Sequence, residues 1–248
     1  MFQILHQIRN GRSEIRIFLH LCIVKKLFSA IALLLLWGIS AWAGEPYFCM
    51  QQGRTLFYER RVAASGKLER TTTWIIGAVH AEGTLSRVDY TFALNKPNGS
   101  PMYGGPSEMS VLVERDGSVR MDVGGTMKAI FANMFPNAEI VSTGEPTLLP
   151  ADMRPGDVLP DARSVVTVHG LKYRTEVTDR QVLREERITV PAGTFDCVVV
   201  REHKVERGPG RNRTTTGETW YSRGIGYVRH DTYDKNLRLE TTEVLKKY

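Results

Sequence analysis

The chain has few of the residues and motifs that most enzyme classes need. Its 248 residues include only three cysteines and six histidines. The sequence contains no Gly-x-Ser-x-Gly elbow, no His-Glu-x-x-His metal motif and no phosphate-binding glycine loop. The four histidines after residue 43 are scattered, at His80, His169, His203 and His230. We therefore predict no metal site, no cofactor and no catalytic residues, and we favour a non-catalytic protein while enzymatic activity stays open.

Long apolar runs are also scarce, and the main one lies near the N-terminus. Lys25 and Lys26 precede an almost wholly apolar segment, 27–37, and the small-x-small sequence Ala41-Trp42-Ala43 follows. These are the parts of a secretory signal peptide. The run is shorter than the about 20 residues that a membrane-spanning helix needs. We therefore expect residues 24–43 to be a signal peptide that is cleaved after Ala43.

A mixed segment, residues 1–23, stands before this signal. It carries four charged residues in no structural pattern, whereas signal peptides place their charges near the start. We interpret it as an extra N-terminal segment that reflects a mis-assigned start, with translation beginning near Leu21 or Val24. A precursor that begins at Met1 would refute this interpretation.

A strong charge of one sign is absent from the part that follows the signal. Residues 44–248 hold 28 basic and 26 acidic residues, so the sequence pI of about 9.3 mostly reflects the removed end. Composition therefore gives no reason to expect a nucleic-acid partner. Membrane contact is expected only through the cleaved signal peptide.

Two cysteines remain after cleavage, Cys49 and Cys197. An even number in an oxidising compartment permits a disulfide, which would close a loop of nearly the whole domain. The alternative is that Cys197 is a small buried apolar residue and Cys49 a free thiol near a frayed terminus. The sequence leaves both possibilities open.

Alternation of apolar and polar residues recurs from Thr55 onward and predicts half-buried strands. In the clearest case, two alternating runs at 109–113 and 118–123 flank the turn residues Asp116-Gly117, which indicates a β-hairpin. The further predicted strands are 56–62, 68–78, 85–94, 171–178, 181–190, 195–205, 214–222, 227–233 and 237–245. About ten strands joined mostly by short turns favour an antiparallel sheet that curls to protect its edges.

One segment has helical instead of strand spacing. Its apolar residues lie between Gly124-Gly125 and Pro136, and they are Met127, Ile130, Phe131, Met134 and Phe135. We predict a short amphipathic helix that ends at the proline. Two stretches without periodicity, 95–106 and 137–162, are expected to be lids or rim loops. The expected fold is therefore a single all-β domain, 44–248, whose strongly curved antiparallel sheet or incomplete barrel carries one helix on its concave side.

Two stretches resemble a known family. They are 188–197, Ile-Thr-Val-Pro-Ala-Gly-Thr-Phe-Asp-Cys, and 219–228, Thr-Trp-Tyr-Ser-Arg-Gly-Ile-Gly-Tyr-Val. They resemble the TapB-like family of exported bacterial envelope proteins, and the likeness extends to 53–73, to 149–160 and to Tyr233-Asp234 with the closing strand. The resemblance implies a periplasmic β-rich domain of YmcC-like or lipoprotein-carrier-like shape. It supplies no catalytic residues, and this chain departs from the pattern at its arginine-rich hairpin tip, 208–213.

The leading functional hypothesis is a non-catalytic periplasmic module that binds an apolar, lipid-like ligand or an envelope partner protein. Its candidate ligand-binding residues are Met127, Ile130, Phe131, Met134 and Phe135 on the helix, with Trp74 and Trp220 on the sheet. The helix stripe has an alternative role as ordinary core. A structural scaffold that uses the rim loops is a second hypothesis. The third, an envelope hydrolase, has only scattered carboxylates and the unsupported set Ser222, His230 and Asp231 in its favour.

Overall fold

The computed structural model describes residues 44–248. The predicted signal peptide, 24–43, and the segment before it, 1–23, lie outside the described residues.

The described chain forms one 13-stranded sheet in which every neighbouring pair of strands is antiparallel. In chain order the elements are β1 (Thr55–Val62), β2 (Leu68–Glu82), β3 (Leu85–Asn95), β4 (Ser107–Glu114), β5 (Val119–Met121), α2 (Gly125–Met134), β6 (Ile140–Glu145), β7 (Thr147–Leu149), β8 (Ala162–Val168), β9 (Leu171–Val190), β10 (Gly193–Gly208), β11 (Arg211–Ser222), β12 (Gly226–Tyr233) and β13 (Leu239–Lys247). The predicted all-β class and the single predicted helix are confirmed. The prediction missed β6, β7 and β8, of which β6 and β7 lie in the stretch expected to be a loop.

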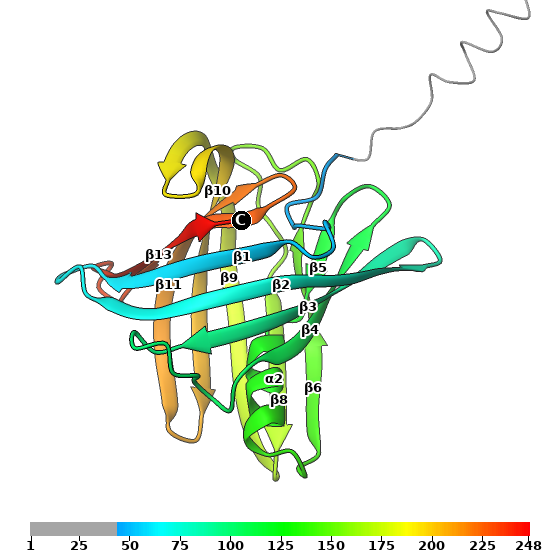
Figure 1. The fold of residues 1–248 in the computed structure, drawn as a ribbon, viewed down its shortest axis with the longest axis vertical. Coiled ribbons are helices and arrows are strands. Elements are labelled where there is room, and N and C mark those ends of the chain that lie inside the picture. Colours follow the sequence, from blue (N-terminus) through cyan, green and yellow to red (C-terminus); the bar gives the residue numbers. More distant parts are fainter. Residues whose placement is uncertain (1–43) are drawn as a thin grey trace, which may run out of the picture. The chain divides into compact units, whose positions relative to one another are not determined.

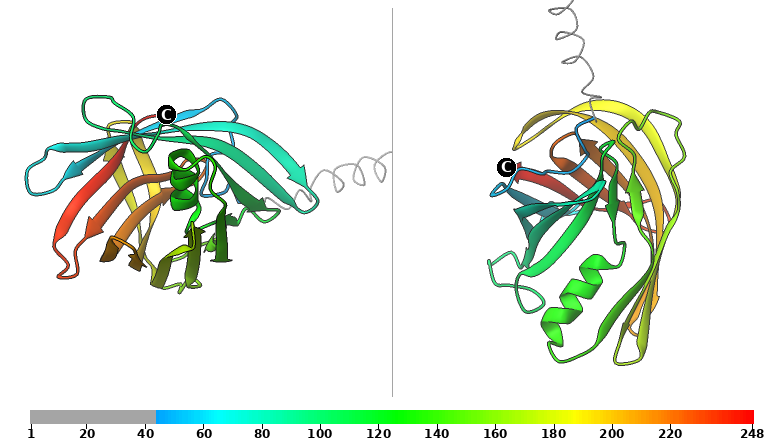
Figure 2. Two further views of the ribbon diagram at one scale, coloured as in Figure 1. Left: turned by 90° about the horizontal axis from the view of Figure 1, so that it is seen from below. Right: turned by 90° about the vertical axis from the view of Figure 1, so that its right-hand side faces the viewer.

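The sheet curves strongly, and its first and last strands pair with each other. The strand order is β6-β8-β9-β10-β11-β12-β13-β1-β2-β3-β4-β5-β7, so β1 pairs with β13 in the middle of the sheet. Strands β9 to β11 run across the direction of β1 to β3 (Figure 1). Helix α2 lies inside the curve, as predicted (Figure 2), and packs against β4, β6 and β8. The sheet is therefore an incomplete barrel whose edge strand β6 packs against the helix.

A buried arginine connects the edge strand β7 to β9, the third strand from the opposite edge. The Arg180 side chain on β9 is fully buried, and its guanidinium donates hydrogen bonds to the Leu148 carbonyl on β7 at 3.1 Å and to the Pro160 carbonyl at 2.8 Å. Its Nε lies 3.6 Å from the Glu202 carboxylate on β10. The edge strand β7 is thus held against the opposite end of the sheet by side-chain hydrogen bonds. This contact is called the seam below.

Pairing register identifies the residues on the concave face. Met109 on β4 touches the helix, since its Cε lies 3.2 Å from where a side chain at Gly125 would begin. Met109 pairs with Tyr90, and Tyr90 pairs with Ile76 on β2. Because directly paired residues share a face and alternate residues of a strand do too, the β2 residues at 74, 72 and 70 also face inward.

The concave face carries an aromatic cluster centred on Trp74. The Trp74 ring lies 5.2 Å from Tyr90, 5.9 Å from Tyr58, 5.5 Å from Tyr227 and 6.1 Å from Phe48, measured between ring centroids. Tyr58 also stacks on Tyr227 at 4.4 Å and donates a hydrogen bond to the Tyr227 carbonyl. Phe48 comes from the buried segment before β1, so the N-terminal end of the described chain forms part of this core.

Candidate functional site

A groove opens on the concave side between helix α2 and strands β2 to β4. Its volume is about 620 Å³. The apolar part of its lining consists of Tyr90, Met109, Val111, Met121, Ala129 and Ala132, and the charged part of Arg87, Asp89, Glu108, Asp122 and Lys128. The helix presents Gly125, Lys128, Ala129 and Ala132 to the groove, a set with the i, i+3, i+4, i+7 spacing of one helix face. Three of these four residues have small side chains or none, which leaves the space open.

The five predicted helix residues do not line this groove. Phe131 packs on the Tyr173 ring of β9 at 4.8 Å, and Phe135 meets the His169 ring edge-on at 5.7 Å. Ile130 packs against the core and Met127 is half-buried, whereas Met134 and Phe135 are 45% and 39% exposed. The apolar stripe therefore docks the helix on the β8–β9 side of the sheet. A ligand-binding role for these residues stays a prediction.

The close docking of the helix depends on Gly124. A side chain there would meet Ser164 Oγ and would lie 2.8 Å from Val166 Cγ2, both on β8. Gly124 has an ordinary helical φ of −87°, so the requirement concerns space and not backbone conformation.

Trp74 lies on the concave face, as the sequence suggested, and is partly exposed. Its indole Nε1 is buried and has no hydrogen-bond partner. A buried indole N–H usually finds an acceptor, so this unpaired donor is an exception within the cluster. Trp74 also connects two parts of the site, since its ring contacts Tyr90, which lines the groove.

A charged row continues the same face away from the aromatic cluster. Arg70, Arg60, Glu243 and His230 follow one another across β2, β1, β13 and β12, each paired with the next. We call these four residues the arginine row. Arg70 lies 3.5 Å from the Glu243 carboxylate, which also accepts a hydrogen bond of 2.6 Å from Thr72. The concave face is therefore aromatic at one end and charged at the other.

The two arginines of the row are incompletely paired. The Nε atoms of Arg60 and Arg70 are buried and make no hydrogen bond, although Arg60 Nε lies 2.8 Å from the partly exposed Glu69 carboxylate. Burial, followed by the charge of Arg70, lowers the pKa of Arg60. Side-chain exposures of 11% for Arg60 and 27% for Arg70 leave both within reach of solvent. Arg70 Nε therefore has no hydrogen-bond acceptor, and Arg60 Nε has only its ion pair with Glu69.

His230 at the end of the row is held neutral. Burial lowers its pKa from 6.5 to about 4, and the positive charges of Arg60, Lys204 and Arg70 act in the same direction. The neutral ring lies 2.8 Å, through Nδ1, from the Thr219 hydroxyl. Its protonation state therefore depends on the net positive charge of this part of the concave face.

Trp220, the second predicted tryptophan, lies on the opposite face of the sheet. It pairs with Arg229, which pairs with Val244, which pairs with Glu59, and Glu59 alternates with the inward-facing Tyr58. The structure therefore does not bring Trp220 and Trp74 together. The sequence alternation in β11 did not distinguish the two faces of the sheet, because residues on both faces are buried there.

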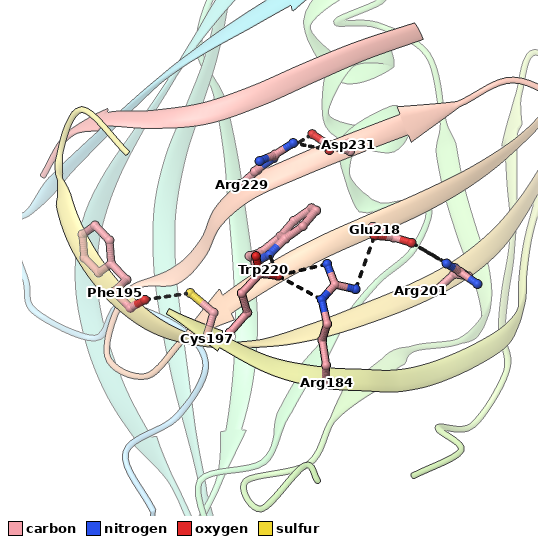
Figure 3. A network of polar contacts seen from close by, with 9 residues as sticks. Arg184, Phe195, Cys197, Arg201, Glu218, Trp220, Arg229 and Asp231 are labelled. Carbon is pink, nitrogen blue, oxygen red and sulfur yellow. Dashed lines mark hydrogen bonds and ion pairs between the residues drawn. The ribbon is translucent and has the colours of Figure 1, made fainter. Parts of the chain in front are cut away.

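The outer tryptophan is buried by charged side chains (Figure 3). The guanidinium groups of Arg229 and Arg184 lie 4.6 Å and 5.6 Å from its ring centroid, and Trp220 Nε1 donates a hydrogen bond of 3.0 Å to Glu186. That bond is the leading cause of a lowered pKa at Glu186. We interpret this arrangement as a structural clamp on the outer face.

Cys49 and Cys197 are both buried and both free in the structure, so the disulfide that their number permits is not formed. Cys49 follows the buried residues Tyr47 and Phe48 and does not lie at a frayed end. Burial raises the pKa of Cys49, and it raises that of Cys197 to about 12. Thiols in such surroundings are poor nucleophiles at neutral pH.

The residues considered for hydrolysis are not assembled. His230 faces Thr219, whereas Asp231 on the other side of β12 bonds to Arg229 at 2.6 Å. Glu185 and Glu186 are consecutive strand residues and so point to opposite faces. Within residues 44–248, no group of three or more His, Cys, Asp or Glu side chains is placed to hold a metal ion. In the same range, no helix has the length and apolar character to cross a membrane.

Comparison with known structures supports the fold. The chain is similar to a candidate exported protein with a YmcC-like fold from Bacteroides fragilis, with 22% identity and a TM-score of 0.65 over 81% of this chain and 97% of that one. It is also similar to a candidate lipoprotein from Parabacteroides distasonis, with 22% identity and a TM-score of 0.67 over 82% and 98% of the two chains. No curated protein matches the chain.

A family model matches residues 51–245, which include nearly all of the sheet and both motifs at 188–197 and 219–228. The family resemblance predicted from those motifs and the expected YmcC-like shape are thus confirmed. The protein belongs to the DUF3108-like family.

Proposed function

We propose that the protein is a non-catalytic binding module of the periplasm that holds a ligand with an apolar part on its concave face. The observation that carries this proposal is the groove of about 620 Å³ between α2 and β2 to β4. The helix turns Phe131 toward β9 and offers no large apolar side chain here, only Gly125, Ala129, Ala132 and Lys128, so the space is not filled by the protein. Concave, partly apolar pockets of this size are typical of small-molecule sites.

The groove continues into the aromatic cluster. Tyr90 belongs to both, and Trp74 next to it is partly exposed and has a free donor. A ligand with a chain or ring in the groove would therefore contact aromatic faces at one end and Met109 and Met121 at the other. Methionine adapts to irregular apolar shapes, which suits a flexible chain.

Two variants of the helix test this function. Ala129→Phe places a ring in the groove, whereas Met134→Phe places one on an exposed position of the same helix that does not line it. Binding of monolauroylglycerol, followed by intrinsic tryptophan fluorescence, should be lost in the first variant and kept in the second. Mass spectrometry of organic extracts from natively purified protein should show a co-purifying apolar molecule. Equal binding by both variants, with no co-purifying molecule, would contradict the proposal.

The periplasmic location rests on the sequence of residues 24–43 and on the family resemblance. N-terminal sequencing of the protein from the periplasmic fraction should begin at Gly44. Recovery of the whole chain in the cytoplasmic fraction would contradict it.

An envelope partner protein is the second candidate occupant, at a different surface. The end of α2 and the neighbouring loop expose Tyr103 (46%), Met134 (45%) and Phe135 (39%). Asn133 ties the two together by donating hydrogen bonds to the carbonyls of Gly105 and Pro106. A photo-crosslinking residue at Tyr103 should capture one specific protein in intact cells, and a crosslink-free monomer would argue against this surface.

A further inference from the structure

The arginine row has donors that the protein itself does not satisfy. Four of the buried side-chain atoms without a hydrogen-bond partner lie on or near the concave face, namely Nε of Arg60, Arg70 and Arg180 and Nε1 of Trp74. Arg180 belongs to the fully buried seam, so a ligand cannot reach it. The other three belong to one continuous surface, because Arg70 and Trp74 are alternate residues of β2 and Arg60 pairs with Arg70.

The two arginines have a single buried carboxylate next to them. Arg60 and Arg70 face each other across β1 and β2, and only Glu243 is buried beside them, since Glu69 is 44% exposed. Lys204 and Arg213 lie nearby, as their effects on His230 and Arg60 show, but Lys204 pairs with Glu206 at 3.6 Å and Arg213 pairs with Glu240. Arg60 and Arg70 are therefore two adjacent, partly buried guanidinium groups beside one buried carboxylate, an arrangement that can accept a further anion.

We propose that the arginine row binds a phosphate-type oxyanion carried by the ligand whose apolar part occupies the groove. The oxyanion would accept from Arg60 and Arg70, and Trp74 would donate to a polar atom between the anion and the apolar part. Guanidinium groups suit this role because they present several charge-assisted donors in a fixed plane. The inference names the ligand class of the proposed binding module and therefore rests on that function.

Three matched probes separate the oxyanion from the chain. Lauroyl-lysophosphatidic acid has the same chain and glycerol as monolauroylglycerol plus one phosphate, and glycerol 3-phosphate is its head group alone. With the exported protein, we expect the lysophosphatidic acid to bind at least about tenfold more tightly than monolauroylglycerol. Binding of glycerol 3-phosphate would point to a small phosphorylated molecule as the source of the anion. If the lysophosphatidic acid binds and glycerol 3-phosphate does not, the source of the anion is a lipid. Either result supports an oxyanion site.

The chain offers a matched control next to the row. Arg61 follows Arg60 on β1 but points outward to Glu59. Arg60→Gln and Arg70→Gln should each weaken the lysophosphatidic acid about tenfold and leave monolauroylglycerol unchanged, while Arg61→Gln should change neither by more than about twofold. Arg60→Lys keeps the charge but loses the planar donors, and so should recover binding only in part.

A measurement on the unmodified protein removes any doubt about the folding of these variants. The imidazole of His230 can be titrated by NMR with and without the lysophosphatidic acid. An anion beside Arg60 and Arg70 offsets their charges, so the pKa of His230 should rise by about one pH unit on binding. Monolauroylglycerol should leave it unchanged.

Failure of the inference is distinguishable from failure of the function. If both lipids bind equally and neither arginine variant matters, the oxyanion site is refuted while the binding module stands. If neither lipid binds the unmodified protein, both are refuted.

Discussion

Replacement of Arg180 tests whether the seam stabilises the incomplete barrel. Arg180→Met keeps most of the buried volume but removes the three hydrogen bonds to the Leu148 and Pro160 carbonyls. It also leaves the Glu202 carboxylate, 3.6 Å away, without its partner. The edge strand β7 would then be held by its pairing with β5, by its one-residue link to β6 and by packing.

The size of the effect follows from the kind of bond that is lost. Hydrogen bonds from a charged donor contribute about 1.5–3 kcal/mol each, and breaking a buried ion pair costs about 3–5 kcal/mol. Both values need a discount here, because Glu202 is 20% exposed and Pro160 is exposed to water. Loss of a buried charge also removes a desolvation cost. We therefore expect Arg180→Met to lower the free energy of unfolding by about 2–4 kcal/mol.

Urea unfolding followed by tryptophan fluorescence measures this loss. With an m-value of about 2–3 kcal/mol/M, the midpoint should fall by about 1 M. Arg187→Met on the same strand is the control, because its ion pair with Asp196 is highly exposed, at 71% and 79%, and should contribute almost nothing. The double variant with Glu202→Gln should regain part of the stability. A midpoint for Arg180→Met within about 0.2 M of the unmodified protein would refute the reasoning.

Three further predictions concern packing, protonation and the thiols. Gly124→Ala should lower the free energy of unfolding by about 1–3 kcal/mol through overpacking against β8, as measured by urea unfolding. The unfolded chain protonates His230 near pH 6.5 and the folded chain only near 4, so stability should be complete above pH 6.5 and decline toward 4. His230→Gln should flatten that decline in thermal unfolding scans, by at most about 3 kcal/mol. A thiol reagent should find Cys49 and Cys197 unreactive in the native protein and both reactive after unfolding without reductant; an intact disulfide would release neither.

Local sequence patterns predicted most of the strands because most strands bury one face. The β4–β5 hairpin shows this, with Asp116-Gly117 in its turn and Gly117 at a φ of 91°. The alternation at 171–177 likewise holds in β9. The edge strands β6 and β7 were missed because β6 is largely exposed and β7 has only three residues, so neither carries a clear burial pattern.

Local sequence patterns could not predict the arginine row, for a different reason. Arg60 and Glu243 meet only because the first strand pairs with the last, a contact between residues 183 positions apart in the sequence. Part of the row could be predicted. Arg60 alternates with Tyr58 on one strand, and Arg70 alternates with Trp74 on the next, so each arginine had to lie on the same face as its aromatic neighbour. The sequence did not show which face of the sheet would be concave. For the same reason we predicted Trp220 as a ligand-binding residue, although it lies on the outer face of the sheet.

The seam also has a consequence for how this scaffold can vary. Main-chain ladders fix the spacing of neighbouring strands at about 4.8 Å wherever they run, so a fully closed barrel changes its bore only by gaining or losing strands. Here β6 and β7 are the two ends of the sheet, and the chain passes from one to the other through Pro146 without a ladder between them, while Arg180 of β9 and helix α2 add side-chain contacts nearby. Because no ladder joins β6 to β7, the bore depends on this one-residue link and on these side chains, and substitutions at Arg180 would change the width of the same thirteen strands.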